Sequence, residues 1–221
     1  MTTQHSRIAI ERIGIDESGK GDYFGPLVIA AVFVDATTQG ELRLMEVRDS
    51  KTLSDGRILE MAPDIKTICP HSIITIGPQK YNELYEKIKN LNRLLAWGHA
   101  KALEILLERG ITCEQAISDQ FGDKRLILNA LQEKGRKVTL EQRPKAESDL
   151  AVAAASILAR AEFLIRLKRL SSEVGTTLPK GASPTVELAA KMIVKKHGQE
   201  RLGQVAKLHF KTTKAVLAPL L

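Results

Sequence analysis

Two adjacent carboxylates in a glycine-rich turn are the first residues of this chain whose types suggest chemistry. Asp16 and Glu17 end an apolar run, and Ser18-Gly19-Lys20-Gly21 follows them directly. Adjacent acids at the end of a buried strand cost free energy unless a cation, a partner or solvent compensates their charge. Glycines let the backbone approach a ligand without interference from side chains. We therefore expect this turn to meet a nucleic-acid phosphate, with a metal ion as the compensating cation.

The same turn partly matches a nucleotide-binding phosphate loop, because Gly14 precedes Gly19-Lys20 by the required four residues. Gly21, however, stands where such loops carry the Ser or Thr that binds magnesium. The two acids would also repel phosphates, and strand-like sequence follows where a helix is required. The phosphate-loop interpretation is therefore rejected.

Further acids stand where predicted elements end or begin. Asp119 follows a predicted strand, and Glu147 and Asp149 precede a predicted helix. An isolated acid at a helix start is commonly only a cap, but several acids at element ends fit the places where α/β active sites gather. Convergent carboxylates suit Mg²⁺ or Mn²⁺, which favour oxygen ligands. Two such ions can activate a water and stabilise the leaving oxygen in phosphodiester hydrolysis.

Basic residues near these acids are candidates for holding backbone phosphates. They are Lys20 with the amides of its turn, Lys51, and the lysines of a basic tail that is predicted to begin at Lys207. Lys plus Arg number 33 against 26 Asp plus Glu, which gives a formal net charge of +7. This excess favours polyanions or acidic surfaces as partners.

Composition and length favour an ordinary globular protein of 221 residues. Cys69 and Cys113 lie far apart and lack metal-ligand spacing, so a reducing cytosol is expected. The histidines show no zinc-ligand spacing, and residues 1–7 contain no apolar secretory segment. The strongly apolar run Leu27–Val34 is too short to span a bilayer. We expect a cytoplasmic location and no membrane contact.

Strands and helices are mixed along the chain, which predicts an α/β domain with a helical C-terminal third. Apolar runs predict strands at residues 8–15, 27–34, 72–76, 113–118 and 138–142. Helical spacing and caps predict helices from Ser54 towards Met61, from Pro78 to Arg109 with a break near Asn90, and over residues 124–133, 148–170 and 184–196.

The motifs around the acids resemble the type 2 ribonuclease H family, which contains ribonucleases HII and HIII. Its signature is similar to Gly14-Ile15-Asp16-Glu17-Ser18-Gly19-Lys20-Gly21. Asp49-Ser50-Lys51-Thr52-Leu53 and Ala153-Ala154-Ala155-Ser156-Ile157-Leu158-Ala159-Arg160 match further motifs in the family's order. The resemblance runs from about residue 8 to residue 213. Ribonuclease HIII is the more similar type, on Gly21-Asp22-Tyr23-Phe24-Gly25-Pro26 and Val205-Ala206-Lys207-Leu208-His209-Phe210-Lys211.

The resemblance implies an RNase H-like fold, a mixed central sheet flanked by helices. It also implies cleavage of the RNA strand of RNA/DNA hybrids with two Mg²⁺ or Mn²⁺ ions, leaving 3′-hydroxyl and 5′-phosphate ends. The implied catalytic and metal-binding residues are Asp16, Glu17, Asp119 and Glu147. Asp149 remains an alternative to Glu147, because the spacing to Ala154-Ala155-Ser156 is one residue shorter than in ribonuclease HII. The implied substrate-binding residues are Gly19, Lys20, Gly21, Ser50 and Lys51.

Two departures from the family's pattern bear on specificity. Ribonuclease HIII enzymes usually carry an N-terminal domain of TBP-like fold, whereas here we expect one catalytic domain over residues 1–221, acting as a monomer. Ribonuclease HII senses RNA–DNA junctions with a tyrosine near Lys180-Gly181-Ala182-Ser183-Pro184, and no tyrosine follows Tyr85 here. HIII-like specificity is therefore expected. Two alternatives stay open: an HII-like ribonuclease that cleaves at single embedded ribonucleotides, and a nucleic-acid-binding protein that does not cleave.

Overall fold

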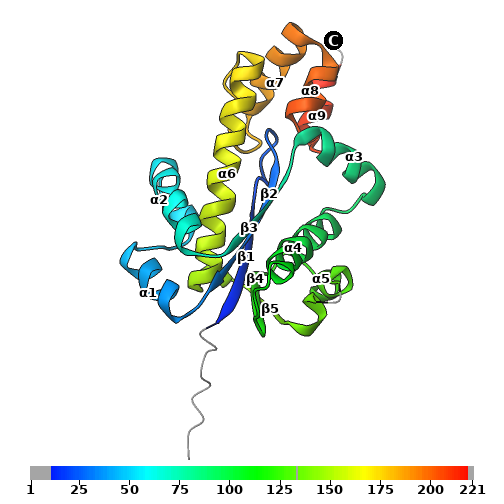
Figure 1. The fold of residues 1–221 in the computed structure, drawn as a ribbon. Helices are drawn as coiled ribbons and strands as arrows, with labels where there is room; N and C mark the ends of the chain where they lie inside the picture. The colour runs from blue at the N-terminus through cyan, green and yellow to red at the C-terminus, as the bar shows by residue number, and fades with distance from the viewer. Residues whose placement is uncertain (1–10, 133, 219–221) are drawn as a thin grey trace, which may run out of the picture.

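A mixed five-stranded sheet forms the centre of the computed structural model, which describes residues 11–132 and 134–218 (Figure 1). The strand order is β3-β2-β1-β4-β5, with β1 antiparallel to β2 and parallel to β4. The strands are β1 Arg12–Ser18, β2 Leu27–Val34, β3 His71–Ile76, β4 Gln115–Asp119 and β5 Thr139–Arg143. The mixed central sheet expected from the sequence is confirmed.

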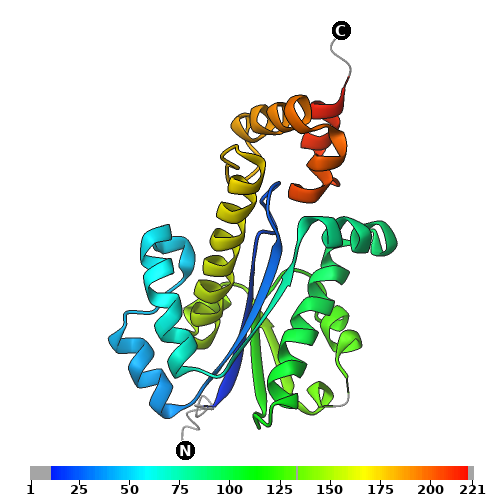
Figure 2. The ribbon, with the colours of Figure 1, turned by 45° about the horizontal axis from the view of Figure 1, so that its top comes forward.

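Helices cover both faces of this sheet (Figure 2). The long helix α6 lies on one face together with α1 and α2, and α4 covers the other face beside α5. Helices α7, α8 and α9 gather beyond the far end of α6, which confirms the expected helical C-terminal extension. The helices are α1 Ala36–Leu44, α2 Asp55–Ile68, α3 Pro78–Ile88, α4 Leu91–Glu108, α5 Lys124–Ala130, α6 Leu150–Val174, α7 Pro184–His197, α8 Gln199–Val205 and α9 Lys211–Leu217.

Strand β2 is apolar throughout because helices bury both of its faces. Val28, Ala30 and Val32 belong to the hydrophobic core on the α6 side. Leu27 and Ile29, which alternate with them, belong to the core on the α4 side. This alternation places β2 inside the sheet, as the uninterrupted apolar run predicted.

Gly14 allows α6 to pack directly on β1. A Cβ atom at Gly14 would lie 2.1 Å from the backbone carbon of Ala151 and 2.2 Å from the amide nitrogen of Val152. Any side chain would therefore force the helix away from the strand. The first turn of α6 is consequently held beside the end of β1, where the two adjacent acids lie.

Several predicted boundaries differ from the structure. Helix α1 was not predicted, although Asp35 and Thr38 form a capping box at its start. The helix predicted over residues 124–133 ends at Ala130. The first strand begins at Arg12 and reaches Ser18, beyond its predicted end. Residues 8–10, which the prediction included, lie outside the described residues.

The stretch that was predicted to begin a basic tail at Lys207 is folded onto the rest of the chain. Lys207 is fully buried, and Ala206 beside it forms an antiparallel bridge with Phe24. The chain then continues into helix α9, whose Lys211 and Lys214 are exposed. Because it is buried, Lys207 is not available to hold a backbone phosphate as predicted, whereas Lys211 and Lys214 are accessible.

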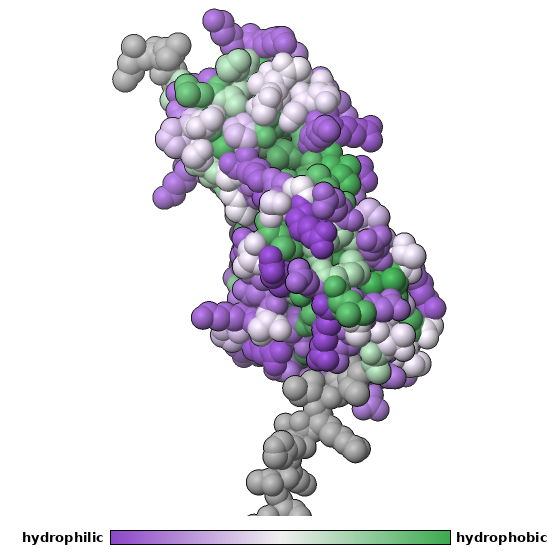
Figure 3. All heavy atoms as spheres, turned by 90° about the vertical axis from the view of Figure 1, so that its left-hand side faces the viewer, coloured by the Kyte–Doolittle hydropathy of each residue, from purple (hydrophilic) through white to green (hydrophobic). Residues whose placement is uncertain are grey.

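The surface on the α2 side is mostly hydrophilic, with apolar patches between the polar side chains (Figure 3). Within residues 11–132 and 134–218, no helix combines the length and the apolar character needed to cross a bilayer.

Candidate active site

The parallel pairing of β1 with β4 brings the first acids together. Ile15 lies opposite Ser118 in the register, so Asp16 and Asp119 follow at the same edge of the sheet. Both acids line one cleft of about 610 Å³, together with Glu17. Three of the predicted acids therefore share a single cleft, although Asp119 lies far along the chain from the adjacent Asp16 and Glu17.

Glu147 lies next to this cleft in the short helical turn Ala146–Ser148. The amide of Ala146 lies 3.4 Å from Oδ1 of Asp119 and donates to it. Nζ of Lys51, a residue that lines the cleft, lies 3.6 Å from Oε1 of Glu147. The other carboxylate oxygen of Glu147 is buried and has no hydrogen-bond partner. Glu147 itself is not among the residues that line the cleft, so Lys51 connects it to the other acids.

Asp149, in contrast to Glu147, has both carboxylate oxygens in contacts that stabilise the fold. Its Oδ2 lies 2.7 Å from Nε of Arg12, and both side chains are buried. Its Oδ1 accepts a hydrogen bond from the amide of Ala151, which caps helix α6. Both oxygens are thus committed to partners, and this geometry favours Glu147 over Asp149 as the fourth acid.

Asp16 and Glu17 face opposite sides of β1, as neighbours in a strand do. Oε2 of Glu17 lies 3.0 Å from Nε2 of His99 on α4, and its Oε1 lies 3.4 Å from Nζ of Lys20. The His99 ring is buried and packs against Phe121 at a centroid distance of 4.7 Å. His99 therefore fixes the orientation of the Glu17 carboxylate.

Charge and burial affect the adjacent acids differently. Burial holds the pKa of Asp16 well above its usual value, and the neighbouring charge of Glu17 adds to this rise. Burial alone would also raise the pKa of Glu17, but the hydrogen bond and charge of His99, with Lys20, lower it overall. Burial alone would lower the pKa of Lys51, but Glu147 and other nearby carboxylates raise it overall. The charged form is therefore disfavoured in Asp16, whereas His99 and Lys20 favour it in Glu17.

Comparison with known proteins identifies the family. A family model described as Ribonuclease HII matches residues 13–213, which is most of the chain. The chain belongs to the ribonuclease HII family. Ribonuclease HIII of Protochlamydia amoebophila (strain UWE25) is 52% identical over 206 residues, which cover 93% of this chain and 68% of that protein. Ribonuclease HIII of Chlamydia pneumoniae is 45% identical over 216 residues, which cover 96% of this chain and 72% of that protein.

Solved structures of the ribonuclease HII family agree with this result. The crystal structure of Bst-RNase HIII in complex with Mn²⁺ matches with a TM-score of 0.88 and 37% identity, covering 95% of this chain and 70% of that one. The structure of Aquifex aeolicus RNase H3 matches with a TM-score of 0.73 and 31% identity, and the match covers 92% of this chain and 73% of that one. The resemblance to type 2 ribonucleases H and the RNase H-like fold are therefore confirmed.

The donor set fits the metals that this family implies. The four predicted acids offer only carboxylate oxygens, which Mg²⁺ and Mn²⁺ prefer, and Glu147 has a buried oxygen without a partner. In the described part of the chain, no three His, Cys, Asp or Glu side chains are already arranged to hold an ion. Glu17 contacts His99 and Lys20, and Glu147 contacts Lys51. The assignment of individual metal ligands stays a prediction.

The predicted substrate-binding residues of this ribonuclease all line the cleft. They are Gly19, Lys20, Gly21, Ser50 and Lys51. Gly19 has a φ of +88°, and a Cβ there would lie 2.1 Å from the carbonyl oxygen of Pro26, so only glycine fits. The space around Gly21 is open, because a Cβ atom there would meet nothing within 4 Å. A ligand can therefore approach the backbone of this turn closely.

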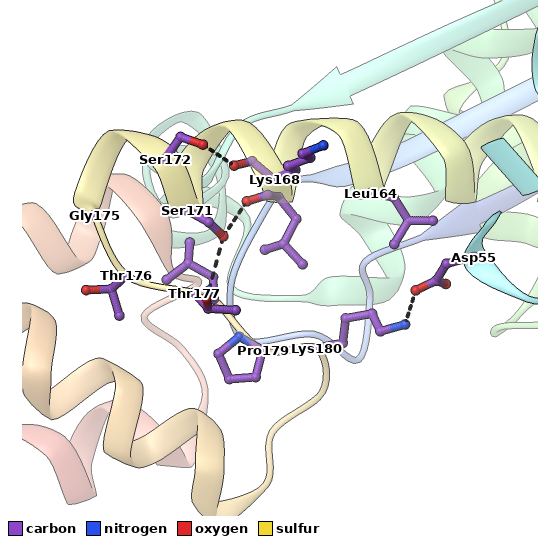
Figure 4. A pocket seen from close by; sticks show the side chains of 12 residues that line it. Asp55, Leu164, Lys168, Ser171, Ser172, Gly175, Thr176, Thr177, Pro179 and Lys180 are labelled. Carbon is purple, nitrogen blue, oxygen red and sulfur yellow. Dashed lines mark hydrogen bonds and ion pairs between the residues drawn. The ribbon is translucent and has the colours of Figure 1, made fainter.

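Sequence reasoning missed four residues around the cleft. It assigned no role in the site to His99, Asp55, Arg160 or Lys180. Asp55 pairs with Lys180 and lies 3.5 Å from Nη2 of Arg160, and all three residues line the cleft. Asp55 and Lys180 also line a neighbouring hollow beside the C-terminal part of α6 (Figure 4). Arg160 ends the stretch from Ala153 to Arg160 that resembles a family motif, which was the available signal.

Proposed function

We propose that the chain is a metal-dependent endoribonuclease that cleaves the RNA strand of RNA/DNA hybrids and leaves 3′-hydroxyl and 5′-phosphate ends. The observation that carries this proposal is the meeting of Asp16, Glu17 and Asp119 in one cleft with Lys20 and Lys51. Membership of the ribonuclease HII family and the similarity to ribonucleases HIII support the same activity.

The chain's own residues supply binding and orientation. Asp16, Asp119 and Glu147 would hold Mg²⁺ or Mn²⁺, with Glu17 as a further ligand that His99 keeps in place. When bound, these ions activate a water molecule and stabilise the leaving oxygen. The ammonium groups of Lys20 and Lys51 attract backbone phosphates. The glycine-rich backbone approaches the ribose, whose 2′-hydroxyl distinguishes RNA from DNA.

We expect the protein to cut a labelled RNA/DNA hybrid in Mg²⁺ or Mn²⁺ and to stop when EDTA removes the metal. An RNA duplex and a DNA duplex of the same sequence serve as controls, and enzymatic end-labelling identifies the product termini. Binding of the hybrid without any cut product in either metal would instead favour the non-cleaving alternative.

We also propose HIII-like specificity, which the absence of a tyrosine after Tyr85 supports. A DNA duplex with one embedded ribonucleotide should be cut far more slowly than a full hybrid of the same length. Initial rates on the two substrates under identical conditions measure this difference. Efficient cleavage at the single ribonucleotide would show HII-like junction specificity instead. The single-domain extent over residues 1–221, the monomeric state and the cytoplasmic location stay predictions.

A further inference from the structure

Lys207 is a buried lysine that the C-terminal segment places against the glycine-rich turn. Its side chain has 0% of its surface exposed. Its Nζ lies 2.7 Å from the carbonyl oxygens of both Asp22 and Gly25, and 3.4 Å from that of Phe24. One ammonium group therefore donates to carbonyls that all belong to a single turn.

The side chain of Lys207 does more than fill space in the protein interior. Burying an ammonium group is costly unless hydrogen bonds or opposite charges compensate it. Burial lowers the pKa of Lys207 to about 7, and the nearby Asp22 carboxylate acts in the opposite direction. An apolar side chain could fill the same space but would leave these carbonyls without their donor. The specific contribution of the ammonium is thus its contact with the carbonyls of the turn.

The backbone of the same segment also holds this turn. The amide of Lys207 donates to the carbonyl of Tyr23 at 2.8 Å, and the amide of Gly25 donates to the carbonyl of Val205 at 2.9 Å. Figure 1 shows the β1–β2 turn reaching the group formed by α7, α8 and α9. The far half of the turn, residues 22–25, is therefore fixed by the C-terminal helices.

Asp22 connects this fixed half to the half that lines the cleft. Its carbonyl accepts from Lys207, and its amide lies 3.3 Å from the carbonyl of Gly19. Its side-chain Oδ1 accepts from the amide of Gly181 at 2.7 Å. A shift of the Asp22 backbone would consequently move residues 19–21, which line the cleft.

We propose that Lys207 is a positioning residue for substrate binding. Its ammonium group holds the carbonyls of Asp22 and Gly25, and this contact sets how residues 19–21 face the ribose and phosphate of the hybrid. The C-terminal helices are then a working part of the active centre rather than a peripheral extension. This inference rests on the proposed function of the cleft.

The test replaces the ammonium by an apolar side chain of similar length in K207M. We expect KM for the hybrid, and Kd for the hybrid in EDTA, to rise roughly tenfold, which corresponds to about 1.4 kcal/mol of binding free energy. The change in kcat per folded molecule should be smaller. Amide hydrogen exchange of residues 19–25 should accelerate. If K207M does not fold, K207Q is measured instead. Its uncharged side chain is one atom shorter than that of lysine and cannot hold all three carbonyls, so KM and Kd should still rise.

Asn82→Ala is the matched control. Asn82 on α3 donates to the carbonyls of Gly203 and Ala206 and accepts from the amide of Leu208, so it anchors the same segment without a hydrogen bond to the turn. N82A should lower Tm but leave KM and Kd unchanged. The proposal is overturned if the Lys207 variant leaves KM and Kd at the wild-type values, or if N82A raises them equally.

The same experiment separates failure of this inference from failure of the proposed function. A wild-type chain that cleaves no hybrid in Mg²⁺ or Mn²⁺ would refute the proposed function. The exchange rates of residues 19–25 and the Kd in EDTA need no cleavage. An unchanged exchange rate in the Lys207 variant would refute the positioning role even in an active enzyme.

Discussion

Replacing Asp16 or Asp119 by Asn is expected to lower the rate of hybrid cleavage by roughly 10³-fold or more while the protein stays folded. Both carboxylates line the cleft at the same edge of the sheet. Asn keeps the size of the side chain but removes the charge that would hold a divalent cation. Metal ions contribute several kcal/mol of charge stabilisation in the transition state, and each 1.36 kcal/mol corresponds to about tenfold in rate.

Thermal unfolding in EDTA is the control for these variants. D16N should be at least as stable as the wild type, because Asp16 is a buried acid with acidic neighbours. Circular dichroism then shows whether lost cleavage reflects the site or the fold. Retained cleavage in either variant would contradict the site assignment. Isothermal titration calorimetry with Mn²⁺, which does not depend on cleavage, should show weaker binding of the metal in both variants.

Glu147→Gln and Asp149→Asn are expected to separate catalysis from stability. E147Q should reduce cleavage by roughly 10²-fold or more with little change in unfolding, since Glu147 has a buried oxygen without a partner near the other acids. D149N should destabilise the fold by about 3–5 kcal/mol, because it breaks the buried ion pair between Asp149 and Arg12.

Chemical denaturation and steady-state kinetics on the two variants measure this difference. For a chain of this size the stability loss in D149N corresponds to a fall in Tm of roughly 10 °C. Below that transition, the cleavage rate of D149N per folded molecule should stay within about threefold of the wild type. The reverse pattern, a stable but inactive D149N beside an active E147Q, would make Asp149 the fourth acid.

The positions of the strands and of the acids along the chain could be predicted because they depend on local patterns. The apolar run of β2, the helix start at Ser54 and the helix break near Asn90 are visible in the sequence and agree with the structure. Helix α1 was missed because its residues are mostly polar, with only Thr38 and Leu42 buried, so no clear apolar stripe indicates it.

Residues whose roles depend on distant partners could not be predicted in the same way. His99 lies on a helix far along the chain from Glu17, and only the packing of α4 on the sheet brings the two side chains together. Lys207 belongs to a basic stretch, which in a sequence is typical of a solvated surface. Its burial depends on the turn carbonyls that surround it, and a sequence does not show this arrangement. Asp149 differs from Glu147 through its contact with Arg12, which is equally non-local.

The parallel contact between β1 and β4 also has a consequence for how activity returns during refolding. β1 and β2 form an antiparallel hairpin that closes a short loop, whereas β4 joins β1 across the intervening helices α1–α4. Contacts between residues distant in sequence close later because their loop entropy is larger. Asp119 meets Asp16 only in that late step. Recovery of cleavage should therefore lag behind recovery of helical signal, which makes catalysis a reporter of completed β-sheet assembly.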